Sequence, residues 1–284
     1  VSENKNKIRE ISLVLFLFSY ICTKFRKNFC AVYQLCARTQ SAIIQNIKDV
    51  LEHKTQKTNQ KRIRKGETIM VNVGIIGAGR IGQVHMNSIL TRVPNAKIKA
   101  VADPFLSEEA DKKAKAAGAE YTTKDYKDIL ADKDIDAVII CSSTDTHSPI
   151  SIEAIKAGKH VFCEKPIDHD VDKIKEVIKT LEGTGLKYQV GFNRRFDHNF
   201  EAAQRAVVNG KIGAPHIIKI TSRDPEPPSA EYVKVSGGMF LDMTIHDFDM
   251  VRFLAGCDAE EVYVQAANLV DPEIGKAGDV DTAI

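Results

Sequence analysis

A glycine-rich segment shows the most specific chemistry in the sequence. Gly77-Ala-Gly79-Arg-Ile-Gly82 follows an apolar run and opens an amphipathic one, and Asp103 comes 26 residues after Gly77. In this setting the first glycine permits a tight turn, the second lets a pyrophosphate approach the backbone, and the third lets a helix pack on a strand. The segment therefore predicts a dinucleotide site; a glycine-rich turn without a ligand is the alternative.

The residues around these glycines indicate which dinucleotide is bound. Arg80 and Ile81 open the predicted helix, whose unpaired N–H groups face the phosphates. The carboxylate of Asp103 can hydrogen-bond both ribose hydroxyls and repels a 2′-phosphate, which favours NAD over NADP. Arg80 weakens this preference, because a guanidinium in the phosphate loop could pair with a 2′-phosphate.

A second polar segment follows the apolar run 137–141. It contains Ser142, Thr144 and His147. Loops that leave the carboxyl ends of parallel strands line the cofactor crevice, and small hydroxyl residues there let a nicotinamide lie close to the backbone. We expect these residues to contact the cofactor; an ordinary helix cap is the alternative.

A third polar segment, Glu164-Lys165-Pro166, follows the next apolar run and should lie on the same rim. We expect Glu164 to contact the cofactor. The ammonium of Lys165 could donate to a substrate hydroxyl and stabilise a developing alkoxide. Pro166 could hold the turn in a cis peptide. A solvated loop lysine is the alternative.

Asp242 and His246 form the fourth candidate. The spacing i, i+4 places both on one face of a predicted helix. A carboxylate there could fix the tautomer of the imidazole, whose other nitrogen accepts a proton near neutral pH. A surface ion pair is the alternative, and a zinc site is disfavoured because no second His or Cys stands at ligand spacing.

Apolar and amphipathic segments alternate after residue 70, which is typical of βαβ units around a parallel sheet. Ser107 is the expected N-cap of one helix and Gly118 its end. The expected strands span 71–76, 98–102, 137–141, 160–163 and 187–192, and the expected helices span 80–90, 107–117, 149–157 and 172–182. The sequence thus predicts a Rossmann-type NAD-binding domain over residues 70–192.

The pattern changes over residues 193–284. We expect helices over 200–209 and from Gly237 to about 254, with Gly256 as the terminator, and strands over 215–222, 262–267 and 281–284. Because the last strand needs a partner, we expect a C-terminally truncated domain. The expected fold class is α/β: a Rossmann-type parallel sheet followed by an incomplete α+β substrate and oligomerisation domain with a mainly antiparallel sheet.

Composition supports two globular domains. The chain has 284 residues, of which 43% are hydrophobic and 27% charged. Residues 1–69 hold 14 basic and 5 acidic side chains, a charge of +9, whereas 26 basic and 33 acidic side chains leave −7 on residues 70–284. The acidic part disfavours nucleic acid as a substrate. Cys141, Cys163 and Cys257 do not stand at Cys-x-x-Cys or paired Cys/His spacing. This indicates buried free thiols and a cytoplasmic protein.

Residues 1–69 are interpreted as a non-native or disordered basic extension. The apolar run 11–22 is shorter than the about 20 residues of a membrane span, and no small-residue cleavage site follows it as in a signal peptide. The polar, basic segment 54–65 is typical of disorder and could attract anionic partners by charge alone. Lys65-Gly66-Glu67 can be encoded by a purine-rich ribosome-binding site, so we hypothesise that translation starts at Met70.

Six segments together show a family resemblance. In chain order they are GIIGAGRIG, KAVADP, CSSTDTH, AGKHVFCEKPID, GFNRRFD and GGMFLDMTIHDFD. They resemble the Gfo/Idh/MocA oxidoreductases, most closely the inositol 2-dehydrogenases among them. The resemblance extends from Met70 to the end of the chain, and the segments that contain EKP and IHD-x-D, taken with the glycine motif, are specific to the family.

The resemblance implies a catalytic set of Lys165, Asp242 and His246, in which His246 takes the hydroxyl proton while a hydride passes to NAD. It also implies that Arg195 and Asp224 contact polyol hydroxyls. The implied reaction is the NAD-dependent oxidation of a cyclic polyol to a ketone, with myo-inositol and 2-keto-myo-inositol (scyllo-inosose) as the pair, in inositol catabolism. The implied assembly is a homo-oligomer, a tetramer in the full-length protein.

Two other functions remain open at this point. A related sugar or sugar-nucleotide dehydrogenase would keep the catalytic residues and differ in its substrate pocket. A non-catalytic dinucleotide-sensing regulator would have no need of an aligned base. The expected ligands are NAD, which is favoured over NADP, and a small polyol; no metal, nucleic acid or membrane partner is expected.

Overall fold

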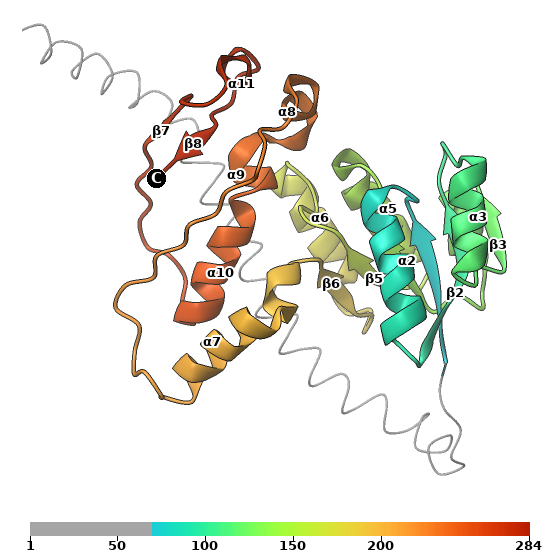
Figure 1. Cartoon of the computed structure of the whole chain (residues 1–284). Coiled ribbons are helices and arrows are strands. Elements are labelled where there is room, and N and C mark those ends of the chain that lie inside the picture. Colours follow the sequence, from blue (N-terminus) through green and yellow to red (C-terminus); the bar gives the residue numbers. More distant parts are fainter. Residues whose placement is uncertain (1–69) are drawn as a thin grey trace, which may run out of the picture.

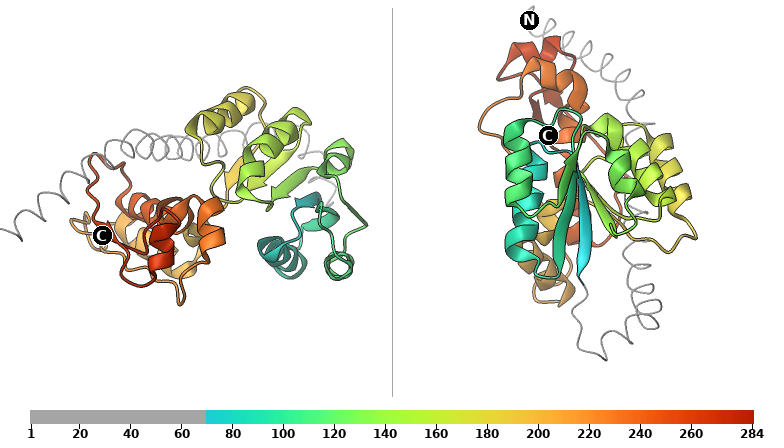
Figure 2. Two further views of the ribbon diagram at one scale, coloured as in Figure 1. Left: turned by 90° about the horizontal axis from the view of Figure 1, so that it is seen from above. Right: turned by 90° about the vertical axis from the view of Figure 1, so that its right-hand side faces the viewer.

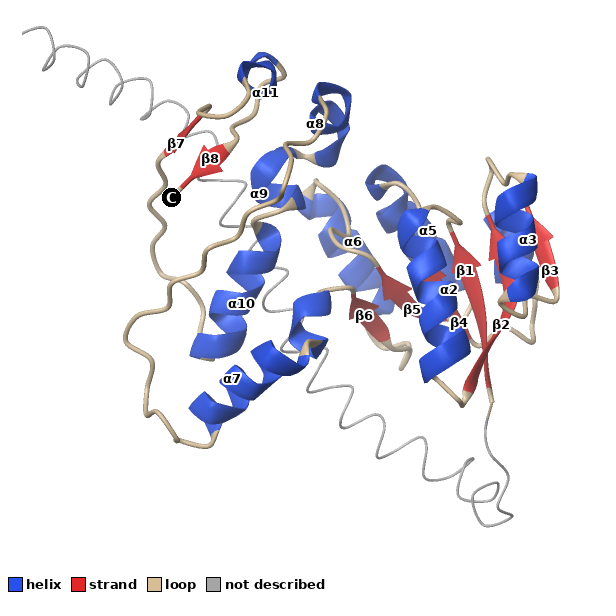
Figure 3. Ribbon diagram, in the orientation of Figure 1, coloured by secondary structure: helices blue, strands red, loops and turns tan. Residues whose placement is uncertain are grey.

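The computed structural model describes residues 70–284, and Figure 1 shows a sheet with its helices followed by a mainly helical region. The interpretation of residues 1–69 as a non-native or disordered extension lies outside the described residues. Figure 3 separates the strands from the helices. The long strands belong to the first region, which positions the glycine motif.

Six parallel strands form the sheet, in the order β3-β2-β1-β4-β5-β6. The chain extends outward from β1 in both directions, so the strand order reverses between β1 and β4. Ligands of such sheets bind at the carboxyl ends of the strands beside this reversal. The strands are β1 (Val71–Ile76), β2 (Ala96–Ala102), β3 (Tyr121–Thr123), β4 (Ala137–Ile140), β5 (His160–Cys163) and β6 (Tyr188–Val190).

Helices cover both faces of the sheet, as the right-hand view of Figure 2 shows. One core packs α2 (Arg80–Arg92) and α3 (Glu108–Ala116) against β1 and β2. The other packs α4 (Tyr126–Ala131), α5 (Thr144–Lys156) and α6 (Val171–Leu181) against the opposite face. Ile75 and Val101 are wholly buried, and each such side chain stabilises the fold by about 1.5–3 kcal/mol.

The elements predicted for this region are present, with two omissions, boundaries that differ by one or two residues, and one that differs by five. Strand β3 and helix α4 were not predicted; with 3 and 6 residues they are too short to show a periodicity. Helix α5 begins at Thr144 instead of residue 149, because Pro149 lies inside the helix and does not start it. Ser107 caps α3 as expected, accepting a hydrogen bond from the Ala110 amide at 3.1 Å.

The region after the sheet is mainly helical. Two short strands, β7 and β8, pair antiparallel, in agreement with the expected fold class. The elements are the 3-10 helix η1 (Asn193–Phe196), α7 (His198–Val208), α8 (Ala230–Ser236), α9 (Gly238–Asp242), α10 (Ile245–Ala255), β7 (Ala266–Ala267), α11 (Pro272–Lys276) and β8 (Thr282–Ala283).

Two strand predictions for this region are wrong, one wholly and one in part. Residues 215–222 alternate apolar and polar side chains but form no strand; no other strand pairs with them, and Ile217 is 88% exposed. The strand predicted over 262–267 is reduced to its last two residues. Helices α8 and α11 were not predicted.

The helix predicted from Gly237 to residue 254 is broken. Gly237 and Gly238 have φ values of +85° and +79°, and the left-handed Gly237 separates α8 from α9, whose first residue is Gly238. A second break follows Asp242, where the amide and the hydroxyl of Thr244 both donate to the Met239 carbonyl, at 2.9 and 3.2 Å. A hydroxyl that bonds back to the preceding turn competes with the helical pattern. Asp242 and His246 therefore lie on different helices, α9 and α10.

Between residues 70 and 284, none of the helices combines the length and the apolar character that a membrane span requires.

Candidate active site

The glycine turn joins β1 to α2 at the reversal of the strand order. Gly77 has φ +103°, and a Cβ on it would lie 2.6 Å from the carbonyl of Cys141 on β4's side of the turn. A Cβ on Gly82 would collide with the carbonyl oxygen of Gly77, whereas no atom lies within 4 Å of a Cβ on Gly79. Packing thus requires the first and third glycines, and the second borders open space that a ligand can approach.

The start of α2 fits the pyrophosphate of a dinucleotide. This 13-residue helix begins after Gly79 with no side-chain cap and no acidic residue in its first turn. Its first residues, Arg80 and Ile81, are exposed. Uncapped N–H groups at the positive end of a helix attract phosphate oxygens.

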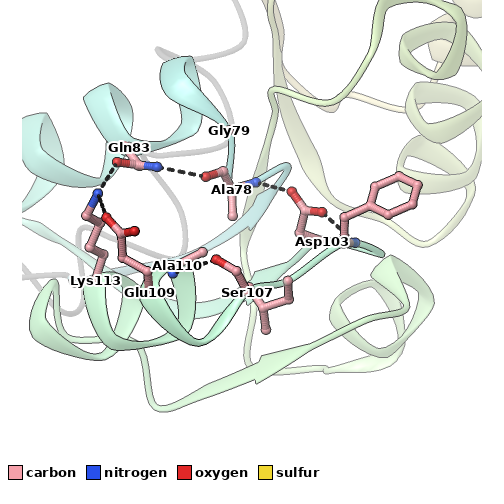
Figure 4. Close-up of a pocket in the computed structure, with 10 residues that line it drawn as sticks. Ala78, Gly79, Gln83, Asp103, Ser107, Glu109, Ala110 and Lys113 are labelled. Carbon is pink, nitrogen blue, oxygen red and sulfur yellow. Dashed lines mark hydrogen bonds and ion pairs between the residues drawn. The ribbon is translucent and has the colours of Figure 1, made fainter.

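Asp103 lies beside this turn at the end of β2. Its Oδ2 accepts a hydrogen bond from the Ala78 amide at 2.7 Å, and its Oδ1 accepts one from the Phe105 amide at 2.8 Å (Figure 4). Each carboxylate oxygen has a second lone pair, so the side chain is held in place and still has acceptors for two ribose hydroxyls. The glycine turn, the helix start and Asp103 therefore fit NAD.

Ser142 lies in the loop between β4 and α5, and Thr144 and His147 lie at the start of α5. The hydroxyl of Ser142 is hydrogen-bonded to that of Thr146 at 2.6 Å, and Thr144 opens α5. His147 is 2% exposed, with Nδ1 2.8 Å from the Pro166 carbonyl oxygen and Nε2 3.0 Å from that of Ser142. Because both ring nitrogens face protein carbonyl groups, His147 ties the start of α5 to the loop after β5; its contact with the cofactor stays a prediction.

Glu164 is held at the end of β5 by contacts that the sequence did not reveal. Its Oε1 lies 2.7 Å from Nε2 of His85 on α2, and the two side chains are 15% and 21% exposed. The ring of His85 also packs edge-on against Phe162. A Cβ on Gly191 would lie 3.0 Å from the Glu164 carboxyl group, so glycine makes room for it. Helix α2 therefore contacts both the glycine turn and the residue before Lys165.

Lys165 and Asp242 join the sheet region to the helical region. The Lys165 ammonium donates to the backbone carbonyl of Asp242 at 2.6 Å and to its Oδ1 at 3.0 Å. The peptide bond from Lys165 to Pro166 is cis. Tyr232 on α8 also hydrogen-bonds the Asp242 carboxylate; partial burial and that carboxylate raise the pKa of Tyr232 to about 12. Asp242 is thus engaged by two donors from different elements.

His246 lies at the start of α10 in a partly buried position against Phe192. Within the part of the chain that the structure describes, its buried Nδ1 has no hydrogen-bond partner. The prediction that Asp242 bonds to this ring is wrong, because the carboxylate is turned to Lys165. Burial, with the positive charges of Lys165 and Arg194 nearby, lowers the pKa of His246 to about 4. The imidazole is therefore neutral at pH 7 and able to accept a proton.

Arg195 and Asp224, the residues predicted to contact substrate, have different surroundings. Arg195 donates to both carboxylate oxygens of the buried Asp249, at 2.8 and 2.7 Å, and stacks on Phe253. This fork uses Nε and Nη2 of the guanidinium and leaves the donors of Nη1 unused by Asp249, and the predicted substrate contact of Arg195 stays a prediction. Asp224 is exposed in the irregular segment before α8, and no contact brings it to Lys165.

Sequence reasoning missed His85, Tyr232 and Arg194. Arg194 pairs with Asp247 and bonds Ser222 at 3.2 Å. Its partner Asp247 lies 53 residues later in the sequence, so no local pattern indicates the pair. His85 and Tyr232 are single polar aromatic residues on helices, with no local pattern that marks them. Among residues 70–284, no three His, Cys, Asp or Glu side chains gather as a metal site would require.

A Rossmann-type sheet, a glycine turn open to phosphate, and a lysine near a neutral histidine are features of the class of nicotinamide-dependent oxidoreductases. Comparison with known families agrees. The model of an oxidoreductase family with an NAD-binding Rossmann fold matches residues 71–192, and that of the GFO/IDH/MocA C-terminal domain matches residues 200–284. The chain belongs to the GFO/IDH/MocA oxidoreductase family.

Similar proteins within this family include inositol dehydrogenases. The chain is 47% identical to myo-inositol 2-dehydrogenase of Thermotoga maritima over 75% of its own length and 64% of that protein. It is 48% identical to inositol 2-dehydrogenase of Rhizobium meliloti, over 75% and 63%. The crystal structure of scyllo-inositol dehydrogenase from Lactobacillus casei with NAD(H) and scyllo-inositol matches with a TM-score of 0.64 and 34% identity, over 75% and 64%. The chain thus spans less than two thirds of the length of these relatives.

Proposed function

We propose that the protein is an NAD-dependent dehydrogenase that oxidises a secondary alcohol of a cyclic polyol to a ketone. The observation that supports this most directly is the contact of Lys165 with Asp242 near His246. The imidazole of His246 is neutral at pH 7 because its pKa is low. An ammonium and a neutral base near each other are the two groups that an alcohol must meet to lose its proton.

The residues divide the proton and charge chemistry between them. When bound, NAD accepts the hydride from the carbon that carries the hydroxyl. Lys165 uses two of its three N–H donors on Asp242 and keeps one for the substrate oxygen, where it stabilises developing negative charge. His246 accepts the hydroxyl proton. Its low pKa makes it a weak base, so the proposal needs Lys165 to acidify the same hydroxyl.

Among cyclic polyols we propose myo-inositol, which would give 2-keto-myo-inositol in inositol catabolism. Relatives that are 47% and 48% identical to this chain are inositol 2-dehydrogenases by name. The second candidate is scyllo-inositol, because a structurally similar relative is crystallised with it. Both alcohols offer a ring hydroxyl to the same pair of groups.

The test is an initial-rate panel with the natural protein. Myo-inositol, scyllo-inositol, glucose and xylose are each supplied with NAD and with NADP. We expect the highest kcat/KM for an inositol with NAD. A higher value for glucose or xylose would reject the substrate, and absence of reduced cofactor with all four alcohols would reject the polyol dehydrogenase.

The same proposal extends to organisation and location. We propose that residues 70–192 bind the cofactor and that residues 193–284 contribute to substrate binding and subunit contacts in a homo-oligomer. Cys141, Cys163 and Cys257 are free thiols; the first two are buried as predicted, whereas Cys257 is exposed. Free thiols suit a reducing compartment, so we propose that the reaction takes place in the cytoplasm.

A further inference from the structure

A recess lies between α2 and α3, directly beside Asp103 (Figure 4). Its volume is about 350 Å³. Ala78 and Gly79 of the glycine turn border it on one side, and Ser107, at the start of α3, borders it on another. A ribose held by Asp103 therefore has this recess next to its hydroxyls.

Three charged side chains line the recess. Besides Asp103 they are Glu109 and Lys113, one turn apart on α3. The Lys113 ammonium lies 2.7 Å from the Glu109 carboxylate and donates to Oε1 of Gln83 on α2 at 3.1 Å. The lining thus holds two negative charges and one positive charge, and the positive charge is already engaged.

This arrangement bears on the choice between the two nicotinamide dinucleotides, which differ by a phosphate on the 2′ oxygen of the adenosine ribose. A phosphate in the recess would meet the repulsion of Asp103 and Glu109. Lys113 is the cation among the lining residues, and Glu109 offers it a competing anion. The neighbouring Glu108, which shares the first turn of α3, does not line the recess.

We propose that Glu109 is a specificity-determining residue, which excludes a 2′-phosphate by occupying Lys113. The inference rests on the proposed use of NAD, and it adds a second selector to Asp103. Replacing Asp103 by Ser removes one negative charge, so that the lining becomes neutral. Replacing Glu109 by Gln as well leaves a net positive charge and frees the ammonium to pair with phosphate.

The size of the effect follows from exposure. The side chains of Lys113 and Glu109 are 49% and 77% exposed, so solvent weakens their interaction, and freeing the lysine should change affinity by about fivefold. The change should appear in the binding of the phosphorylated cofactor alone. Glutamine keeps the size and the helix preference of glutamate, so the fold should be retained.

The experiment measures fluorescence titrations of NADH and NADPH, without substrate, on the natural protein carrying Asp103→Ser. To this variant Glu109→Gln is added, and Glu108→Gln serves as the matched control, since it removes the same charge from the same helical turn. A third variant combines Glu109→Gln with Lys113→Met. We expect Glu109→Gln to tighten NADPH binding about fivefold relative to NADH, Glu108→Gln to change the ratio little, and Lys113→Met to cancel the gain.

Two results would overturn the inference: an equal effect of Glu109→Gln and Glu108→Gln, or a gain that persists after Lys113→Met. Either would mean that overall charge, and not Lys113, sets the preference. Failure of the proposed use of NAD is distinguishable from both, because the unaltered protein would then not bind NADH more tightly than NADPH.

Discussion

The low pKa of His246 predicts a specific loss of stability in mild acid. Burial, Lys165 and Arg194 lower this pKa from 6.5 in a free ring to about 4 in the folded protein. Between these two pH values the unfolded chain binds a proton that the folded chain does not. The free energy of unfolding therefore increases as the pH rises across this window, and this stabilisation is lost as the pH falls through it.

The magnitude follows from the two pKa values. Between pH 7 and pH 5 the ring alone should lower the free energy of unfolding by about 2 kcal/mol. Urea unfolding at both pH values measures the total change, to which other groups also contribute. His246→Gln removes the ring and leaves those groups in place, so the difference between the two proteins isolates the histidine.

A second measurement separates the causes. Lys165→Met removes one of the charges that lower the pKa of His246, so the ring should titrate at a higher pH, visible in the NMR signal of its Cε1 carbon. If the natural protein and His246→Gln lose the same stability between pH 7 and pH 5, or if the ring titrates near 6.5, the assignment of a buried neutral base is refuted.

Three further predictions concern binding, turnover and folding. Gly82→Ala should abolish NADH binding in fluorescence titrations, because its Cβ collides with the Gly77 carbonyl oxygen; unchanged affinity would show that the turn yields easily. Lys165→Met should lower kcat by about a hundredfold or more, the effect of losing one oxyanion donor, with NADH affinity retained; loss of both in a folded variant would contradict the catalytic role. Asp249→Asn should destabilise the protein by about 3 kcal/mol, because it leaves the Arg195 guanidinium without its buried carboxylate; thermal unfolding unchanged by the variant would argue against a structural fork.

The sheet region was predictable because its signals are local. Each strand is a short apolar run, and the glycine turn, the Ser107 cap and the rim segments follow directly along the chain. Only β3 and α4 were not predicted, since neither is long enough to show a periodic pattern of apolar residues. The rim position of Lys165 follows from the rule that parallel strands end at one edge.

The helical region was less predictable because its contacts are distant in sequence. From the sequence Arg195 has no evident partner, because Asp249, to which it donates in the fold, lies 54 residues later. The break after Asp242 depends on Thr244, which bonds back to Met239, and the period of the apolar residues does not reveal it. The partner of Asp242 is likewise Lys165, 77 residues away, and not the nearby His246.

The bridge from Lys165 to Asp242 constrains any exchange of parts between related enzymes. The amine is carried by the sheet region, but both of its acceptors belong to the helical region. A chimaera that joins this sheet to a foreign C-terminal half would keep the dinucleotide site, but the Lys165 amine would have no fixed position. It would be fixed again only if the new half placed a carboxylate and a carbonyl group at the same position. Recombination of halves should therefore yield binders far more often than working catalysts.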